Sequence, residues 1–101
     1  MTTIVGVAWY SAAEWAQLRA IAPDADKLEA TYDEWVAVAE KGLRDLRSAG
    51  LAPERVPVRL DLLRAWCDAR GRRPDAAARA EYAAAELQRI HESRAEQADG
   101  C

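Results

Sequence analysis

The chain has 101 residues, of which 50% are hydrophobic and 31% are charged, and its formal net charge is −3. This length allows one domain with a single hydrophobic core, and the composition excludes disordered and collagen-like proteins. The acidic balance argues against nucleic-acid binding, which needs a basic surface facing the phosphates.

The chain opens with a short strand and a short helix. Residues 3–9 form an apolar run rich in β-branched side chains, which predicts a buried strand. Ser11 is a typical N-cap residue, and Glu14 follows it at the spacing of a capping box. We expect the helix to reach about residue 20 or 21, because Pro23 and Asp24 then interrupt it.

The longest predicted helix begins near Lys27, with Asp26 as its N-cap and Glu29 three residues later. Apolar side chains recur through this segment at steps of three and four, which is typical of one helical face. These side chains are Leu28, Tyr32, Trp35, Ala39, Leu43 and Leu46. Gly50 should end the helix, because glycine readily adopts the left-handed conformation found after a helix C-terminus.

A second strand and two further helices complete the pattern. Residues 54–60 alternate polar and apolar side chains, which predicts a strand, but Pro57 cannot donate to a strand ladder and marks an edge or an outward-facing position. Asp61 is the expected cap of a third helix that Gly71 closes. A fourth helix should begin at Asp75.

The predicted order is strand, helix, helix, strand, helix, helix, within one mostly helical α+β domain over residues 1–93. Residues 94–101 are expected to form a flexible tail. A connection through helices favours parallel pairing of the two strands. Because a two-stranded sheet is marginal, two copies of the chain could join strand edges into a four-stranded sheet, with Pro57 marking the blocked edge. We therefore expect a homodimer.

Several short motifs resemble those of a group of small bacterial proteins of unknown function. They are Ala8-Trp9-Tyr10, Thr31-Tyr32-Asp33-Glu34-Trp35, Ala65-Trp66-Cys67-Asp68-Ala69-Arg70-Gly71, and Asp75 followed by Ala78-Arg79-Ala80-Glu81-Tyr82. The resemblance spans almost the whole chain. It implies a coherent bacterial domain and brings no activity with it.

The aromatic residues suggest two kinds of site besides a plain core. Arginine stacks on aromatic faces, so rings and guanidinium groups together could hold a planar or anionic ligand. The residues of such a cleft would be Tyr10, Trp15, Tyr32, Trp35, Arg70 and Arg79. The other reading is a packed core whose rim arginines pair with carboxylates. In a self-associating protein, the expected interface anchors are Trp9, Trp15 and Trp35, because tryptophan is enriched at interface hot spots.

Catalytic and metal chemistry receive less support from the residues. Cys67 and the single histidine, His91, could form a cysteine-histidine enzyme, but no signature places them together, and this is a remote alternative. Glu14, Asp33 and Glu34 already fit helix positions better than a metal site. We therefore predict no catalytic residue, metal or cofactor.

Only two cysteines occur, and their positions fit neither a metal site nor a dense disulfide framework. No apolar run is long enough to cross a bilayer. We expect a cytoplasmic protein whose primary role is protein-protein interaction, beginning with itself.

Overall fold

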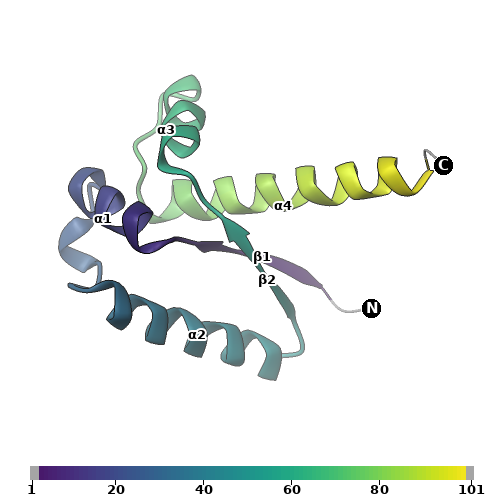
Figure 1. Cartoon of the computed structure of the whole chain (residues 1–101), viewed down its shortest axis with the longest axis horizontal. Coiled ribbons are helices and arrows are strands. Elements are labelled where there is room, and N and C mark those ends of the chain that lie inside the picture. Colours follow the sequence, from purple (N-terminus) through teal and green to yellow (C-terminus); the bar gives the residue numbers. More distant parts are fainter. Residues whose placement is uncertain (1–2, 100–101) are drawn as a thin grey trace.

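The computed structural model describes residues 3–99, and the side chains of residues 3–93. Its elements confirm the predicted order and the mostly helical α+β class (Figure 1). Their bounds are β1 Ile4–Trp9, α1 Ala12–Ile21, α2 Tyr32–Ser48, β2 Ala52–Pro57, α3 Leu60–Ala69 and α4 Ala76–Asp99. The tail expected over residues 94–101 overlaps the end of α4, and the side chains of those residues lie outside the described part of the chain.

The two strands pair in parallel, as predicted, with Ile4 opposite Ala52 and Trp9 opposite Pro57. The sheet lies between α4 on one side and α2 on the other (Figure 1). A Cβ atom on Gly6 would lie 3.0 Å from the backbone oxygen of Ala83. Glycine at this position therefore lets α4 pack closely against β1.

The start of α2 differs from the prediction. Asp26 does not cap the long helix, because residues 25–27 form a separate 3₁₀ helix and Leu28 has extended backbone angles. Thr31 is the N-cap instead, and its Oγ1 accepts a hydrogen bond of 3.1 Å from the Glu34 backbone N–H. The sequence offers two possible caps, the acidic Asp26 and the hydroxyl-bearing Thr31. The long helix begins after Thr31, which lies beyond the extended Leu28.

The third helix also begins earlier than expected. Strand β2 ends at Pro57, and α3 starts at Leu60, so Asp61 lies in the first turn and is not the cap. The Leu60 backbone N–H donates to Glu14 Oε2 at 2.7 Å. A carboxylate from α1 thus satisfies an amide at the start of α3, which a local sequence pattern cannot reveal. Ser11 caps α1 as predicted, with Oγ accepting from the Glu14 N–H at 3.2 Å.

The core lies between the sheet and the helices. The largest of its fully buried side chains are Leu18, Leu43, Val56, Leu60, Leu63 and Cys67. Gly50 and Gly71 both have positive φ angles, 87° and 63°, and end α2 and α3 as predicted. Within residues 3–99, no helix has the length and apolar character needed to span a bilayer.

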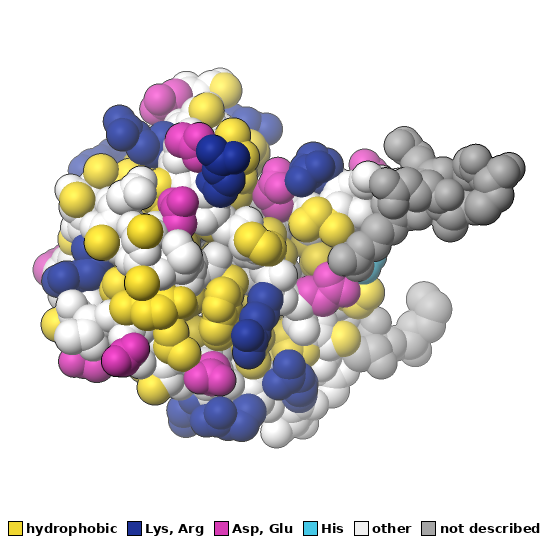
Figure 2. Space-filling view, in the orientation of Figure 1, with side chains coloured by type: hydrophobic (Ala, Val, Ile, Leu, Met, Phe, Trp, Pro, Cys, Tyr) yellow, Lys and Arg dark blue, Asp and Glu magenta, His cyan; other side chains and the backbone are white. Residues whose placement is uncertain are grey.

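Some apolar surface remains outside this core. Figure 2 shows hydrophobic side chains gathered near the middle of one face, with Lys and Arg along its lower border. Three large hydrophobic side chains of the described residues are exposed, namely Ile4 at 44%, Val38 at 54% and Leu62 at 50%. Isolated apolar side chains are normal on a protein surface, so their surroundings decide whether they matter.

Candidate functional site

The predicted aromatic residues converge around Trp35. Its ring centroid lies 5.0 Å from Trp9, 5.4 Å from Tyr10, 5.1 Å from Trp15 and 5.6 Å from Tyr32. The Tyr32 hydroxyl also donates to the Tyr10 carbonyl oxygen at 2.8 Å, which ties α2 to the end of β1. Tyr10, Trp15 and Trp35 are exposed by only 4%, 3% and 9%. This aromatic cluster of five rings therefore packs mainly as part of the core.

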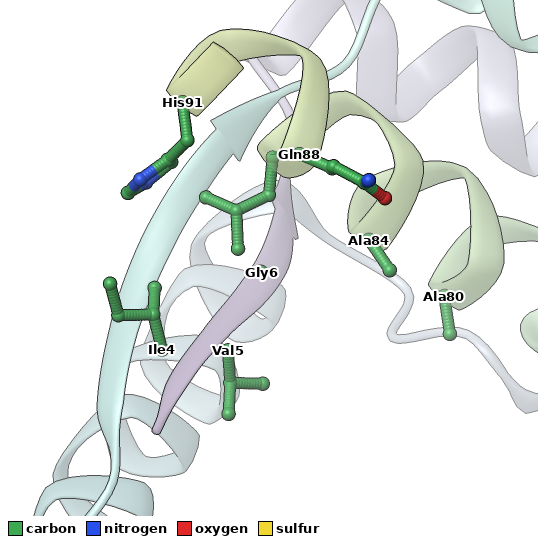
Figure 3. A pocket seen from close by; sticks show the side chains of 8 residues that line it. Ile4, Val5, Gly6, Ala80, Ala84, Gln88 and His91 are labelled. Atoms are coloured by element: carbon green, nitrogen blue, oxygen red, sulfur yellow. The ribbon is translucent and has the colours of Figure 1, made fainter. Parts of the chain in front are cut away.

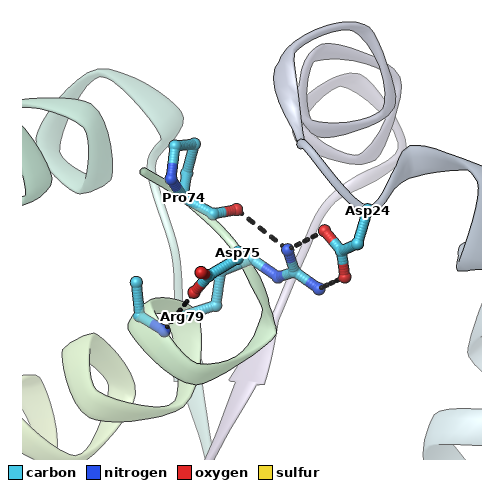
Figure 4. A network of polar contacts seen from close by, with 5 residues as sticks. Asp24, Pro74, Asp75 and Arg79 are labelled. Atoms are coloured by element: carbon cyan, nitrogen blue, oxygen red, sulfur yellow. Dashed lines mark hydrogen bonds and ion pairs between the residues drawn. The ribbon is translucent and has the colours of Figure 1, made fainter. Parts of the chain in front are cut away.

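Arg79 joins the aromatic cluster but is already paired. Its guanidinium donates to both Asp24 carboxylate oxygens, at 2.8 and 3.1 Å, and to the Pro74 carbonyl oxygen at 2.9 Å (Figure 4). The hydrogen bonds from Arg79 hold the pKa of Asp24 below its usual value. Burial raises the pKa of Tyr10 to about 12, although the neighbouring Arg79 charge opposes this shift. Asp24 therefore occupies the guanidinium of Arg79, where an anionic ligand was predicted to bind.

Arg70 lies apart from the aromatic cluster. Its guanidinium carbon lies 4.2 Å from the ring centroid of Trp66, and the side chain donates to the Trp66 carbonyl oxygen at 3.1 Å. Residues four positions apart on a helix are neighbours, so this contact is local. The structure thus brings together five of the six residues predicted for the ligand cleft and leaves Arg70 in a separate contact.

Cys67 and His91 occupy different parts of the fold. Cys67 is buried in the core, where burial raises the pKa of its thiol and so disfavours the nucleophilic thiolate. Ala78 of α4 belongs to the same core cluster. His91 lies thirteen residues further along α4, roughly 20 Å of helix away, with Nε2 3.2 Å from the Glu54 carboxylate. The fold therefore does not bring His91 beside the Cys67 thiol.

The predicted acidic residues are also separated. Glu14 binds the Leu60 N–H, whereas Asp33 and Glu34 are exposed in the first turn of α2. In the part of the chain that the structure describes, no three His, Cys, Asp or Glu residues are placed to hold a metal ion.

A hollow of about 380 Å³ lies at the carboxyl ends of the two strands. Its lining residues are Trp9, Tyr10, Ser11, Glu14, Tyr32, Pro57, Val58 and Arg59. Ends of parallel strands commonly carry ligand sites. However, the polar side chains here already bond to protein groups, for example Glu14 to Leu60 and Arg59 to Asp61.

The outer edge of β1 carries backbone groups that face away from β2. The Ala52 N–H donates to the Thr3 carbonyl at 2.9 Å, and the Val58 N–H donates to the Trp9 carbonyl at 3.0 Å. Thr3 and Trp9 therefore face β2, and backbone groups alternate in direction along a strand. The outward-facing residues of β1 are Ile4, Gly6 and Ala8. No strand of the described chain pairs with this edge.

The outer edge of β2 has a different chemistry. By the same alternation, Pro53, Arg55 and Pro57 face away from β1. The two prolines have no N–H, so only Arg55 could donate to a further strand. Prolines and charges on edge strands are known barriers to strand addition. The two edges of the sheet thus differ, since β2 is blocked and β1 has neither proline nor charge.

An apolar groove follows the outer edge of β1. It has a volume of about 510 Å³ and lies between Ile4, Val5 and Gly6 of β1 and one face of α4 (Figure 3). The α4 residues that line it are Ala80, Ala84, Leu87, Gln88 and His91. A second hollow, of about 320 Å³, shares Gly6 and Ala80 with it and extends to Ala8. We call these two hollows together the edge groove.

The three predicted interface tryptophans are not equally accessible. Trp15 and Trp35 lie in the core, whereas Trp9 is half-buried at the end of β1, where the Arg55 guanidinium carbon lies 4.2 Å from its ring centroid. Because Trp15 and Trp35 are buried in the folded chain, they cannot contact a partner directly and can only pack beneath an interface. The edge groove was not predicted from the sequence. The four-residue spacing of Ala76, Ala80 and Ala84 does indicate that one face of this helix carries only small side chains.

These features define a small, mostly helical α+β domain with one unblocked sheet edge beside an apolar groove. Compared with protein-family models, with curated proteins and with solved structures, the chain matches none of them. A function must therefore be argued from the site alone.

Proposed function

We propose that this domain is a protein-protein interaction module that self-associates by strand addition at the outer edge of β1. The observation that carries the proposal is the contrast between the two sheet edges. Strand β1 offers outward N–H and C=O groups at Ile4, Gly6 and Ala8, whereas β2 has prolines at two of its three outward positions. Unpaired edges without such barriers favour pairing with another strand.

The burial of β1 supports the same proposal. Its sequence, Ile4–Trp9, contains no charged residue, yet every residue in it is half-buried or exposed. Strands of parallel sheets are normally covered on both faces and paired, and two strands alone make a marginal sheet. A second copy at this edge would complete the pairing and cover Ile4, which is 44% exposed.

Matched lysine substitutions of the three exposed hydrophobic side chains test this proposal. Ile4→Lys should convert a dimer into a monomer, because it places a charge on the edge strand and in the edge groove. Val38→Lys on α2 and Leu62→Lys on α3 have similar exposure and should leave the solution mass unchanged. Light scattering measures all three. Dissociation by Val38→Lys or Leu62→Lys alone would move the interface to another surface.

A small-ligand binding module is the second candidate. It is supported by the hollow at the carboxyl ends of β1 and β2, which is lined by Trp9, Tyr10 and Tyr32. Bound ligand should quench tryptophan fluorescence in a metabolite panel, and a flat response across the panel would count against this candidate. The cysteine-dependent enzyme receives no support from the buried Cys67. A cytoplasmic location is part of the proposal, since this thiol is free and reducing compartments keep thiols unpaired.

A further inference from the structure

The chain leaves the two neighbouring strands toward opposite faces of the sheet. After β1 it continues through α1 to α2 on one face, and after β2 it continues through α3 to α4 on the other face (Figure 1). Where neighbouring parallel strands have connections on opposite faces, a crevice opens outside their carboxyl ends, and ligands commonly bind in it. The hollow of about 380 Å³ lies at this position, with residues 9–11 and 57–59 in its lining.

One wall of this hollow is aromatic and is held in place by other contacts. Trp9, Tyr10 and Tyr32 form this wall. The Tyr32 hydroxyl donates to the Tyr10 carbonyl oxygen at 2.8 Å, and the Arg55 guanidinium carbon lies 4.2 Å from the Trp9 ring centroid. Because these contacts order the rings before a ligand arrives, binding costs little side-chain entropy. The wall therefore suits the apolar part of a small ligand.

Two side chains of opposite charge, Glu14 and Arg59, line the same hollow. Glu14 Oε2 accepts a hydrogen bond of 2.7 Å from the Leu60 N–H, so its carboxylate lies against the peptide group that joins Arg59 to Leu60. A carboxylate has about four acceptor positions, which leaves Glu14 with capacity for a ligand that donates hydrogen bonds. A negative and a positive group thus border the hollow close to each other.

Arg59 can exchange its present partner for a ligand. Its Nη2 donates to Asp61 Oδ2 at 2.9 Å, but the two side chains are 68% and 62% exposed. Exposed ion pairs of this kind contribute little to stability. A guanidinium group has five N–H donors and matches a carboxylate with two parallel hydrogen bonds. A ligand carboxylate in the hollow can therefore join or replace Asp61.

We infer that this hollow binds a small zwitterion of the α-amino acid class. The ligand ammonium group binds Glu14, its carboxylate binds Arg59, and its apolar side chain packs against the aromatic wall. The formal charges of the lining residues are one negative and one positive, so a ligand with a single charge would leave one of them without a partner. The inference rests on the ligand-binding candidate described above and names its ligand class. It does not depend on self-association at the edge groove.

Three compounds that differ by one charged group test this assignment. Phenylalanine carries both charges, phenethylamine lacks the carboxylate, and hydrocinnamate lacks the ammonium group. Each is titrated against the wild-type protein, and quenching of tryptophan fluorescence reports binding because Trp9 lines the hollow. Phenylalanine should bind at least about tenfold more tightly than either analogue, since each analogue loses one charge-assisted contact.

Matched variants then assign each charge to its residue. Glu14→Gln keeps an oxygen acceptor for the Leu60 N–H and should weaken phenylalanine and phenethylamine but not hydrocinnamate. Arg59→Gln should weaken phenylalanine and hydrocinnamate but not phenethylamine. Asp61→Asn should tighten phenylalanine binding about two- to fivefold, because it frees the Arg59 guanidinium, a gain that a purely structural role of Arg59 would not produce. Glu40→Gln, on an exposed position of α2, is the control and should change none of the three.

The outcomes separate this inference from the candidate function beneath it. Equal affinities for the three compounds, or a preference for phenylalanine that survives both Glu14→Gln and Arg59→Gln, would overturn the zwitterion assignment alone. Absence of saturable quenching by all three would also overturn it, and a flat response to the wider metabolite panel would then overturn ligand binding as well. Should a variant lose its fold, which circular dichroism detects, the comparison of the three compounds on the wild-type protein decides.

Discussion

Replacing Trp35 with alanine should lower the free energy of unfolding by about 3–5 kcal/mol, the range for loss of a buried aromatic side chain. Trp35 is 9% exposed and contacts four other rings, from β1, α1, α2 and the segment between β1 and α1. Its removal leaves a cavity where these elements meet. Because small domains are stable by only about 5–15 kcal/mol, this variant should be close to unfolding at room temperature.

Urea denaturation followed by far-ultraviolet circular dichroism measures this effect. Trp35→Phe is the matched control, since it keeps an aromatic ring in contact with Trp9 and Trp15 and should lose less than half as much stability. Val38→Ala, on the exposed side of the same helix, should change stability by less than about 0.5 kcal/mol. A small loss for Trp35→Ala would mean that the aromatic cluster is loosely packed and not the main core.

Arg79→Met should destabilise the domain by about 3 kcal/mol, because it leaves the Asp24 carboxylate without its guanidinium partner. The Arg79 and Asp24 side chains are only 11% and 19% exposed, so solvent replaces the lost hydrogen bonds poorly. The pair joins α4 to the segment after α1, far apart in the sequence. The double variant Asp24→Ala/Arg79→Met should recover part of the loss, and additive losses in a double-mutant cycle would argue against direct coupling.

This ion pair should also make stability depend on pH. The pKa of Asp24 is lower in the folded protein than its ordinary value of 3.8, because Arg79 hydrogen-bonds its charged form. The pair therefore stabilises the fold above the unfolded-state pKa, and this stabilisation is lost as the pH falls through the lower folded-state pKa. The stability difference between wild type and Asp24→Asn should shrink below about pH 4. A difference that stays constant from neutral pH down to pH 2 would contradict it.

The sequence predicted the elements well where their signals are local. The apolar run before Trp9, the cap at Ser11 and the glycines at 50 and 71 each act within one turn or strand, and the structure has all of them. The parallel pairing also followed, because strands connected through helices can pair in parallel with ordinary connections. Local propensity and chain connectivity were sufficient for this part of the fold.

Features that depend on distant residues were predicted less well. At the start of α3, the Leu60 N–H donates to Glu14, which is 46 positions away in the sequence. The prediction that Asp61 caps this helix was therefore wrong, because it considered only nearby residues. Arg70 was predicted to join the aromatic cluster, but it directly follows α3 and stacks on Trp66 of that helix instead. The partner of Arg79, Asp24, was missed because its place depends on how α4 packs against the end of α1. These contacts follow from packing, which periodicity does not specify.

Hydrogen exchange of the β1 amides tests strand addition most directly, in the wild-type protein and without any substitution. The outward N–H groups of Gly6 and Ala8 should be protected at high concentration and lose that protection on dilution, whereas the inward N–H groups of Val5 and Val7, which face β2, should stay protected throughout. Rapid exchange of Gly6 and Ala8 at every concentration, with a solution mass of 11.2 kDa, would contradict self-association at this edge.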